Sequence, residues 1–154
     1  MKSVWYYEYP IGTLAIACNG AGITDVTFGS VEGIEAKTPL IEKCAAQLDE
    51  YFKGNRFEFD IPLSLYGTDF QKSVWNALSE IPYGETRSYK DIAVKIGNPK
   101  ACRAVGMANN RNRIMIIIPC HRVIGSNGSL VGYGGGLDVK SQLLAFEKVN
   151  RNNK

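Results

Sequence analysis

The first 28 residues of the chain alternate or cluster apolar and β-branched positions in short runs. Runs of this kind, separated by turn residues, predict an antiparallel meander. The expected strands are Val4–Tyr9, Thr13–Cys18 and Ile23–Phe28. The expected turns between them are Pro10-Ile11-Gly12 and Asn19-Gly20-Ala21-Gly22.

Apolar residues then recur at every third or fourth position, which is the spacing of one face of a helix. Thr38 is the expected N-cap, Pro39 the first helical residue and Gly54 the residue that closes the helix. Residues 1–62 are therefore expected to form a small domain of strands and one helix, in which no pattern suggests catalysis. Residues 63–67 are the expected linker to the remainder of the chain.

Residues 68–154 have a mainly helical pattern. Capping boxes ahead of apolar runs predict helix starts at Thr68 and Ser88. Gly97-Asn98-Pro99 then separates two short helices, which makes Lys100 to about Asn109 the second helix of a helix-turn-helix candidate. An ordinary helical hairpin is the alternative interpretation of this pattern.

One segment of this half departs from the helical spacing. Ile114–Ile118 is short, β-branched and apolar, which predicts a strand buried on both faces, and Pro119 ends it. Cys120 follows, next to His121, the only histidine of the chain. Neighbouring side chains of a strand point to opposite faces, so these two can cooperate only if the backbone turns there. A buried cysteine beside a surface histidine is the alternative.

The distribution of charge adds a possible class of partner. Residues 1–67 hold 5 Lys/Arg and 9 Asp/Glu, whereas residues 68–154 hold 13 and 6, a net charge of +7. A basic domain attracts a polyanion such as nucleic acid, although chance clustering on solvated faces would give the same count.

Other sequence features argue against several classes of protein. No apolar run approaches the roughly 18 residues that a membrane span requires, and the N-terminus lacks the apolar core of a signal peptide. We therefore expect a cytoplasmic protein without membrane contact. The cysteines show no metal-ligand spacing, and the glycine-rich segment from Gly125 to Gly136 matches no nucleotide-binding fingerprint. We therefore expect neither a metal nor a cofactor. The four cysteines are Cys18, Cys44, Cys102 and Cys120.

Several motifs between Thr68 and Glu147 occur together in a known order. They are Tyr83-Gly84-Glu85-Thr86, Ser88-Tyr89, Gly97-Asn98-Pro99-Lys100, Arg103-Ala104-Val105-Gly106, Asn112, Pro119-Cys120-His121-Arg122-Val123 and Tyr133-Gly134-Gly135-Gly136-Leu137. This set resembles the O6-alkylguanine-DNA alkyltransferases, or methylated-DNA–protein-cysteine methyltransferases. The resemblance weakens over residues 1–62.

The resemblance implies an α+β fold. Its N-terminal part would be a ribonuclease H-like domain, a small antiparallel sheet with a helix. Its C-terminal part would be mainly helical, with a helix-turn-helix and a buried active-site strand. The implied reaction is direct-reversal DNA repair in a single turnover. In that reaction Cys120 accepts a methyl or alkyl group from O6 of guanine, with O4 of thymine as a further candidate.

The resemblance also implies roles for individual residues. His121 would take the Cys120 proton through a water molecule, and Glu147 would orient His121. Tyr89 would donate to guanine N3, and Asn112 would join the hydrogen bonds around the active-site turn. The implied base pocket consists of Val123, Tyr133, Gly134 and Gly135.

The candidate recognition helix has small residues bordered by positive charge. In the family this helix enters the minor groove, and the residue at Arg103 fills the base stack while the damaged nucleotide rotates out. The other implied DNA contacts are Lys100, Ala101, Ala104, Arg111 and Arg113. The implied partner is double-stranded DNA that contains O6-alkylguanine, bound by a monomer.

Two alternatives to this function belong to other classes. Relatives whose cysteine is replaced bind alkylated DNA without catalysis, but here Cys120 is present. A cysteine hydrolase with Cys120, His121 and Glu147 would need an oxyanion hole and multiple turnovers. The chain also departs from many relatives, which have prolines at Arg113 and Met115 and serine at Gly134. These departures bear on the rigidity of the pocket and on substrate range.

Overall fold

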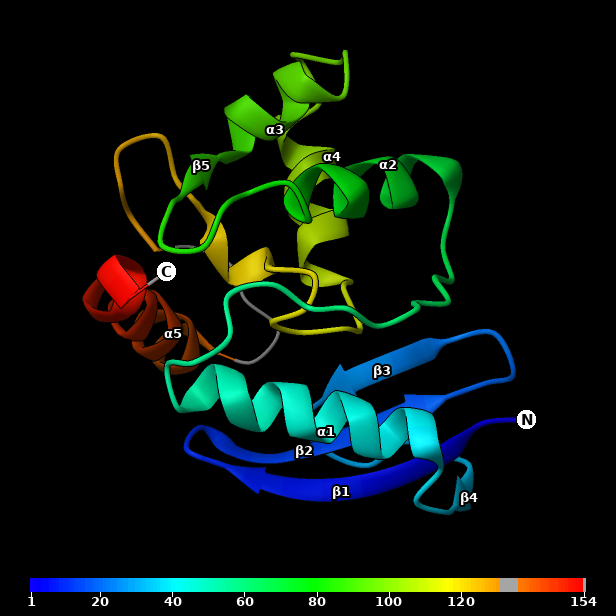
Figure 1. Ribbon diagram of the computed structural model, residues 1–154. Coiled ribbons are helices and arrows are strands. Elements are labelled where there is room, and N and C mark those ends of the chain that lie inside the picture. The colour runs from blue at the N-terminus through cyan, green and yellow to red at the C-terminus, as the bar shows by residue number, and fades with distance from the viewer. Residues whose placement is uncertain (131–135, 154) are drawn as a thin grey trace. The chain divides into compact units, whose positions relative to one another are not determined.

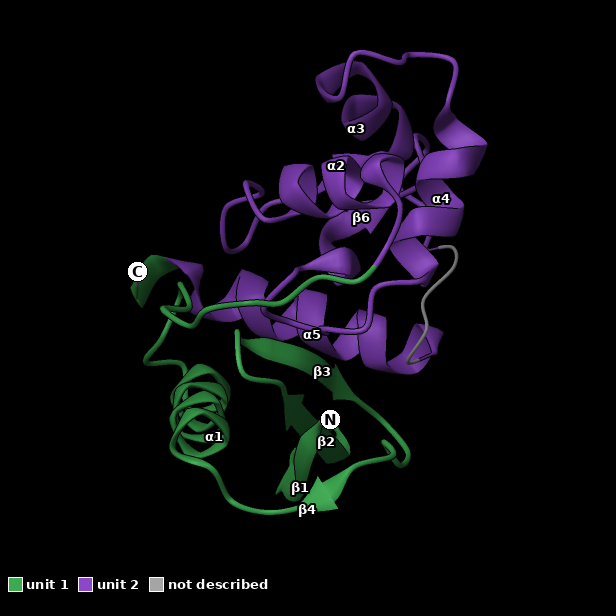
Figure 2. Ribbon diagram, turned by 90° about the vertical axis from the view of Figure 1, so that its right-hand side faces the viewer, with its two compact units in different colours: residues 1–66, 152–154 green, residues 67–151 purple. Residues whose placement is uncertain are grey.

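The computed structural model describes residues 1–130 and 136–153, and its elements combine a sheet with helices (Figure 1). The chain divides into two compact units (Figure 2). The first contains Met1–Tyr66 with the last residues of the chain, and the second contains Gly67–Arg151. The α+β class that the sequence predicted is therefore confirmed.

The first unit is built on a four-stranded sheet in the order β3-β2-β1-β4. Its strands are β1 (Ser3–Tyr9), β2 (Gly12–Cys18), β3 (Ile23–Thr27) and β4 (Ile34–Glu35). The first three form the antiparallel meander that the sequence predicted. β4 pairs with β1 in parallel and was not predicted, because two residues are too few to show a periodic pattern.

Helix α1 (Pro39–Phe52) packs on this sheet (Figure 1). The Thr38 hydroxyl accepts a hydrogen bond from the Ile41 backbone N–H at 3.2 Å, as expected of an N-cap. Gly54, just after the helix, has a φ of 77°, which glycine adopts without steric cost. Fully buried apolar side chains from the helix and the sheet form the core of this unit, among them Leu14, Ile16, Ile41 and Leu48.

The segment after this domain continues along the sheet. Ile23 donates to the Pro62 carbonyl at 2.9 Å, and Ser64 donates to the Ile23 carbonyl at 2.8 Å. Leu63, the first residue of the expected linker, forms an isolated parallel bridge with β3.

The second unit is mainly helical. Helices α2 and α3 begin at the predicted capping boxes of Thr68 and Ser88, and both boxes are formed. Helix α2 packs against α3 and α4. The α-helices are α2 (Asp69–Leu78), α3 (Tyr89–Lys95), α4 (Cys102–Asn110) and α5 (Leu137–Asn150).

Shorter elements complete this unit. The strands β5 (Arg87–Ser88) and β6 (Val123–Ile124) pair in parallel and place the start of α3 beside the residues that follow Cys120. A 3-10 turn, η1, covers Cys120–Arg122, and a second, η2, covers Arg151–Asn153 at the end of the chain. None of the helices in the described ranges is long and apolar enough to cross a membrane.

Two predictions of the second half need correction. Helix α4 begins at Cys102, two residues after the predicted start, because Ala101 closes a turn onto the Asn98 carbonyl at 3.0 Å. The prediction of a buried active-site strand is wrong. Ile114–Ile118 is apolar and mostly buried as predicted, but its backbone forms consecutive turns.

Candidate active site

The segment before Cys120 is a tight, buried turn. Ile117 donates to the Met115 carbonyl at 2.7 Å, and Ile118 donates to the Ile114 carbonyl at 3.1 Å. Between them Ile116 has a φ of 71° and is 1% exposed. A γ-turn with positive φ is rare, and it is strained for a β-branched residue. The surrounding structure must therefore hold this turn in place.

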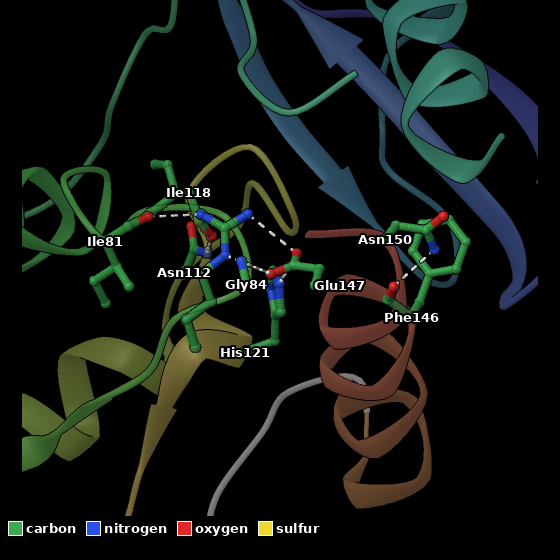
Figure 3. Close-up of polar contacts among 9 residues, drawn as sticks. Ile81, Gly84, Asn112, Ile118, His121, Phe146, Glu147 and Asn150 are labelled. Carbon is green, nitrogen blue, oxygen red and sulfur yellow. Dashed lines mark hydrogen bonds and ion pairs between the residues drawn. The ribbon is translucent and has the colours of Figure 1, made fainter. Parts of the chain in front are cut away.

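The side chain of Asn112 supplies that support (Figure 3). Its amide nitrogen donates to the carbonyls of Ile114 at 3.2 Å and Ile118 at 2.9 Å. Its carbonyl oxygen accepts from the Ile114 backbone at 3.0 Å. Because Asn112 satisfies these backbone groups, they need no neighbouring strand, which explains why an apolar β-branched run is not a strand here.

The backbone turns again at Pro119. Such a turn is what allows the neighbouring side chains of Cys120 and His121 to cooperate. Pro119 has φ −80° and ψ 64°, and the Cys120 N–H donates back to the Ile118 carbonyl at 2.7 Å. The 3-10 turn η1 follows directly. Cys120 is 2% exposed and His121 has no exposed surface, so both side chains face the interior of the unit.

The imidazole of His121 meets a carboxylate from α5. His121 Nε2 lies 2.6 Å from Glu147 Oε2 (Figure 3). Arg122 donates to the same carboxylate twice, from Nε to Oε1 at 2.8 Å and from Nη2 to Oε2 at 3.1 Å. The Gly84 backbone N–H donates to Oε1 at 3.3 Å. Glu147, which is 1% exposed, is therefore buried with several donors.

These contacts fix the charge states of the pair. Burial alone would raise the pKa of Glu147, but its contacts with His121 and Arg122 outweigh burial and hold that pKa well below its usual range. Burial lowers the pKa of His121 from 6.5, although Glu147 opposes this. We infer a neutral imidazole whose Nε2–H donates to an ionised carboxylate.

The other ring nitrogen of His121 is the chemically available one. Nδ1 is buried and has no hydrogen-bond partner among the described residues. With Nε2 committed to Glu147 as a donor, Nδ1 carries the lone pair. The turn thus presents a neutral base one residue after a cysteine.

Sequence reasoning assigned no role to Arg122, which the structure places at the centre of this cluster. Besides holding Glu147, its Nη1 donates to the Ile81 carbonyl at 2.7 Å. Its guanidinium carbon lies 5.6 Å from the ring centroid of Tyr83. The available signal was the implied contact between Glu147 and His121, since a carboxylate buried beside a histidine needs a cation or several donors.

Tyr89 and Val123 lie on adjoining elements. Tyr89 begins α3 directly after β5, and burial raises the pKa of its hydroxyl, with a further contribution from Cys120. Val123 begins β6, where its carbonyl accepts a hydrogen bond from the ammonium group of Lys140. Lys140 is a second buried charged residue that the sequence pattern did not single out.

The expected DNA-binding residues lie on and around α4. Arg103 and Ala104 are exposed on the helix, and Lys100, Arg111 and Arg113 are exposed beyond its ends. Ala101, its N-cap residue, is partly buried. These positions give the helix a positively charged surface with small side chains at its first turn.

Two residues of α4 change the expected surface. Ala108 does not belong to the exposed small side chains of the helix, because it is 2% exposed and its carbonyl accepts from Trp75 Nε1 at 2.8 Å. Met107 is 59% exposed and lies one turn after Arg103. The exposed surface of small side chains on α4 therefore does not reach the end of the helix, because the exposed Met107 interrupts it.

Part of the expected base pocket is not described. Tyr133, Gly134 and Gly135 lie outside the described residues. Within the described ranges, no three His, Cys, Asp or Glu side chains lie close enough together to hold a metal ion.

Two family models match the chain, one for each unit. Residues 4–65 match the ribonuclease-like domain of 6-O-methylguanine DNA methyltransferase, and residues 69–149 match its DNA binding domain. The chain belongs to this methyltransferase family. The family match confirms the resemblance seen in the motifs around Cys120 and extends it to the N-terminal unit.

Curated members of the methyltransferase family are similar over nearly the whole chain. The methylated-DNA–protein-cysteine methyltransferase of Methanosarcina barkeri is 55% identical over 150 residues, which cover 93% of this chain and 95% of that protein. The enzyme of the same name from Mycobacterium leprae is 52% identical over 147 residues, which cover 92% and 89%.

Solved structures of the methyltransferase family share the fold. The O6-methylguanine methyltransferase of Mycobacterium tuberculosis superposes with a TM-score of 0.90 at 46% identity, covering 97% of this chain and 94% of that one. A Mycobacterium tuberculosis OGT structure in complex with DNA superposes with a TM-score of 0.89 at 47% identity, covering 97% and 93%.

Proposed function

We propose that this chain is a methylated-DNA–protein-cysteine methyltransferase that repairs O6-methylguanine in DNA by moving the methyl group to its own Cys120. The observation that carries this assignment is the buried Cys120-His121 pair, in which Glu147 holds a neutral imidazole. Membership of the family supports the reaction type.

The transfer is an in-line displacement. The Cys120 sulfur forms a bond to the alkyl carbon while the bond from that carbon to O6 breaks, and the electron pair of that bond passes to guanine. A thiolate is the effective nucleophile, but an ordinary cysteine is mostly protonated at neutral pH. Cys120 therefore needs a base.

His121 is the proposed base. Its Nδ1 is buried without a partner among the described side chains, so a water molecule between Nδ1 and the Cys120 thiol would carry the proton. Glu147 would stabilise the imidazolium that forms and keep the ring oriented. Arg122 would keep Glu147 ionised and in place.

Tyr89 is the proposed donor to the leaving base. Its raised pKa means that the phenol keeps its proton at neutral pH and can donate to guanine N3 as negative charge develops there. Val123 belongs to the proposed base pocket. The roles of Tyr133, Gly134 and Gly135 in that pocket stay predictions.

The α4 helix is the proposed DNA contact. Its exposed Arg103 would occupy the space in the base stack that an extruded nucleotide leaves, because an empty space costs stacking energy. Lys100, Arg111 and Arg113 would contact phosphates. The relative solved with DNA supports DNA as the partner, and we propose duplex DNA that contains O6-alkylguanine.

The reaction as proposed consumes the protein. A thioether is stable, and the proposed steps provide no second acceptor for its alkyl group. We expect a cytoplasmic monomer. The cysteines are free thiols, which suits a reducing compartment.

A titration tests the assignment. Increasing amounts of protein are added to a fixed amount of duplex DNA with one O6-methylguanine, and the lesion that remains is counted. We expect one lesion removed per protein molecule and none by Cys120→Ser. Repair of many lesions per molecule would indicate a hydrolase, and binding without lesion loss would indicate a non-catalytic reader of alkylated DNA.

A further inference from the structure

Asn109, in the last turn of helix α4, has a buried side-chain amide without a hydrogen bond. The residue is 1% exposed. Neither its Nδ2 nor its Oδ1 has a hydrogen-bond partner in the part of the chain that the structure describes. Burial of an amide that gains no hydrogen bond costs folding free energy. Because most buried polar side chains are hydrogen-bonded, this exception calls for a function.

Asn109 shares a helix face with the contact that α4 makes to Tyr89. A Cβ added at Gly106 would lie 3.7 Å from Cε1 of the Tyr89 ring, so the ring packs on the helix there. Asn109 follows Gly106 by three residues, which puts both on one side of the helix. Helical side chains lean toward the N-terminus of their helix, so the amide leans toward the turn on which the tyrosine ring packs.

The backbone of Asn109 leads to the turn before Cys120. Its carbonyl accepts from the Asn112 N–H at 3.4 Å, and the Asn112 side chain in turn donates to the Ile118 carbonyl. Burial raises the pKa of Tyr89 and Cys120 adds to that shift, so the thiol is close to the phenol. Asn109 therefore lies on α4 between the Tyr89 contact and the segment that carries the nucleophile.

A base that reacts at Cys120 has to come against this face of α4. Cys120 is itself 2% exposed, so the base enters a space that is closed in the free protein. With its N3 at the Tyr89 hydroxyl, the base presents to the helix the edge that carries N3. The polar group next to N3 on guanine is the 2-amino group, which is a hydrogen-bond donor.

We infer that Asn109 is a specificity-determining residue, whose Oδ1 accepts a hydrogen bond from the 2-amino group of the extruded guanine. This inference rests on the proposed function. The base supplies in the complex the partner that the amide lacks in the free protein. A base without a 2-amino group leaves the amide unpaired, and such a site rejects the analogue that lacks the group.

Two substitutions of Asn109 remove the amide. Asn109→Leu keeps the branching of the side chain, and Asn109→Ala is the second variant, which cannot overfill the site. Asn110→Ala, at the exposed neighbouring position of α4, is the matched control. Urea unfolding of the free proteins is measured first. We expect the midpoint of Asn109→Leu to be no lower than that of the natural protein, because an unpaired buried amide has been removed.

The deciding measurement compares two lesions in single turnover. One duplex contains O6-methylguanine, and the other contains O6-methylhypoxanthine, which differs only by the missing 2-amino group. We expect the natural protein to repair the guanine lesion about ten-fold faster, and Asn109→Leu and Asn109→Ala to reduce this ratio to about two-fold or less. Asn110→Ala should keep the ratio of the natural protein. The ratio cancels any change in contacts to the DNA backbone, because both duplexes share it.

The outcomes separate this inference from the proposed function. If the natural protein repairs O6-methylguanine but the ratio is the same in both Asn109 variants, the inference is wrong and the proposed function stands. A lower urea midpoint with equal slowing on both duplexes also overturns it, because the amide then has a structural role such as holding a buried water. If the natural protein takes up a methyl group from neither duplex, the proposed function fails, and the inference fails with it.

Discussion

Glu147 Oε2 lies 2.6 Å from His121 Nε2, and neither side chain is more than 1% exposed. The contacts of Glu147 with His121 and Arg122 hold the pKa of the carboxyl well below its usual range, and burial lowers the pKa of His121 from 6.5. From these directions we infer an ionised carboxylate that accepts the Nε2–H and leaves the lone pair on Nδ1. The residues are 26 positions apart in the chain. We propose that this long-range contact determines the chemistry of the Cys120-His121 pair.

Glu147→Gln tests the charge of this contact. Glutamine can still accept the His121 N–H, but it cannot stabilise the imidazolium. We expect transfer to slow by about 10- to 100-fold and its pH dependence to move to higher pH, because the thiolate–imidazolium state loses a stabilising charge. Single-turnover rates measured across pH check this, with Asp138→Asn at an exposed position of α5 as control. An unchanged pH–rate profile removes Glu147 from the mechanism.

Asn112→Ala tests the support of the active-site turn. The substitution removes all three hydrogen bonds between this side chain and the backbone of Ile114 and Ile118. We expect a loss of about 2 kcal/mol or more in the free energy of unfolding, because buried carbonyls lose their donors. We also expect a roughly 100-fold slower reaction with free O6-benzylguanine, because Cys120 shifts from its reactive position.

The control for this prediction is Asn110→Ala, at an exposed position near the end of the preceding helix. It should leave both the unfolding free energy and the free-base reaction near those of the natural protein. If Asn112→Ala behaves like Asn110→Ala, the turn does not depend on the asparagine amide.

Arg103→Ala tests whether α4 assists nucleotide extrusion. Extrusion costs a few kcal/mol, so loss of a residue that fills the stack should slow repair of duplex DNA by about 100-fold. Reaction with free O6-benzylguanine should change by less than about two-fold, because no stack has to be filled. Equal slowing on both substrates contradicts the assignment of Arg103.

Lys100→Ala is the matched comparison for Arg103. An exposed lysine that contacts a phosphate should weaken binding to all duplexes alike. The slope of log affinity against log salt should fall by about one contact. Filter binding or fluorescence anisotropy at several salt concentrations measures both effects.

The buried imidazole also predicts how stability depends on pH. The folded pKa of His121 is below 6.5, so between these values the unfolded chain binds more protons and stability falls as the pH falls. The slope contributed by one such histidine approaches about 1.4 kcal/mol per pH unit. Glu147, whose folded pKa is depressed from 4.5, adds a further loss only at lower pH.

Urea unfolding at pH 5.5 and pH 7 measures this slope. His121→Asn should lose most of the pH dependence between those values, even if its stability is lower at both. Equal slopes in the natural protein and His121→Asn would mean that folding leaves the pKa of the imidazole unchanged, and a slope of opposite sign would mean that the folded imidazole is protonated. Either result contradicts a buried neutral imidazole that acts as a base.

Local sequence signals predicted the parts of the fold that depend on neighbouring residues. The caps at Thr38, Thr68 and Ser88 were all confirmed, because an N-cap bonds within its own first turn. The prediction of a strand at Ile114–Ile118 was wrong because the conformation of this run depends on a residue outside it. Its composition does not show that Asn112 satisfies the backbone groups that a strand would pair.

Arg122 and Lys140 show why the site could not be completed from the sequence. A charged residue in a helical or turn pattern is usually solvated, and only its distant partners show that it is buried. Arg122 meets Glu147 from 25 positions away, and Lys140 meets Val123 from 17. Cys120 and His121 were found because both stand next to each other after an apolar run.

The most direct test of the central claim is to locate the methyl group after reaction. The protein is incubated with duplex DNA that contains O6-methylguanine, and its mass is measured intact and then by peptide. The account predicts one added methyl group per molecule, carried by Cys120 and absent from Cys18, Cys44 and Cys102. Methyl on another residue, or lesion loss without any change in protein mass, would contradict the transfer of the alkyl group to Cys120.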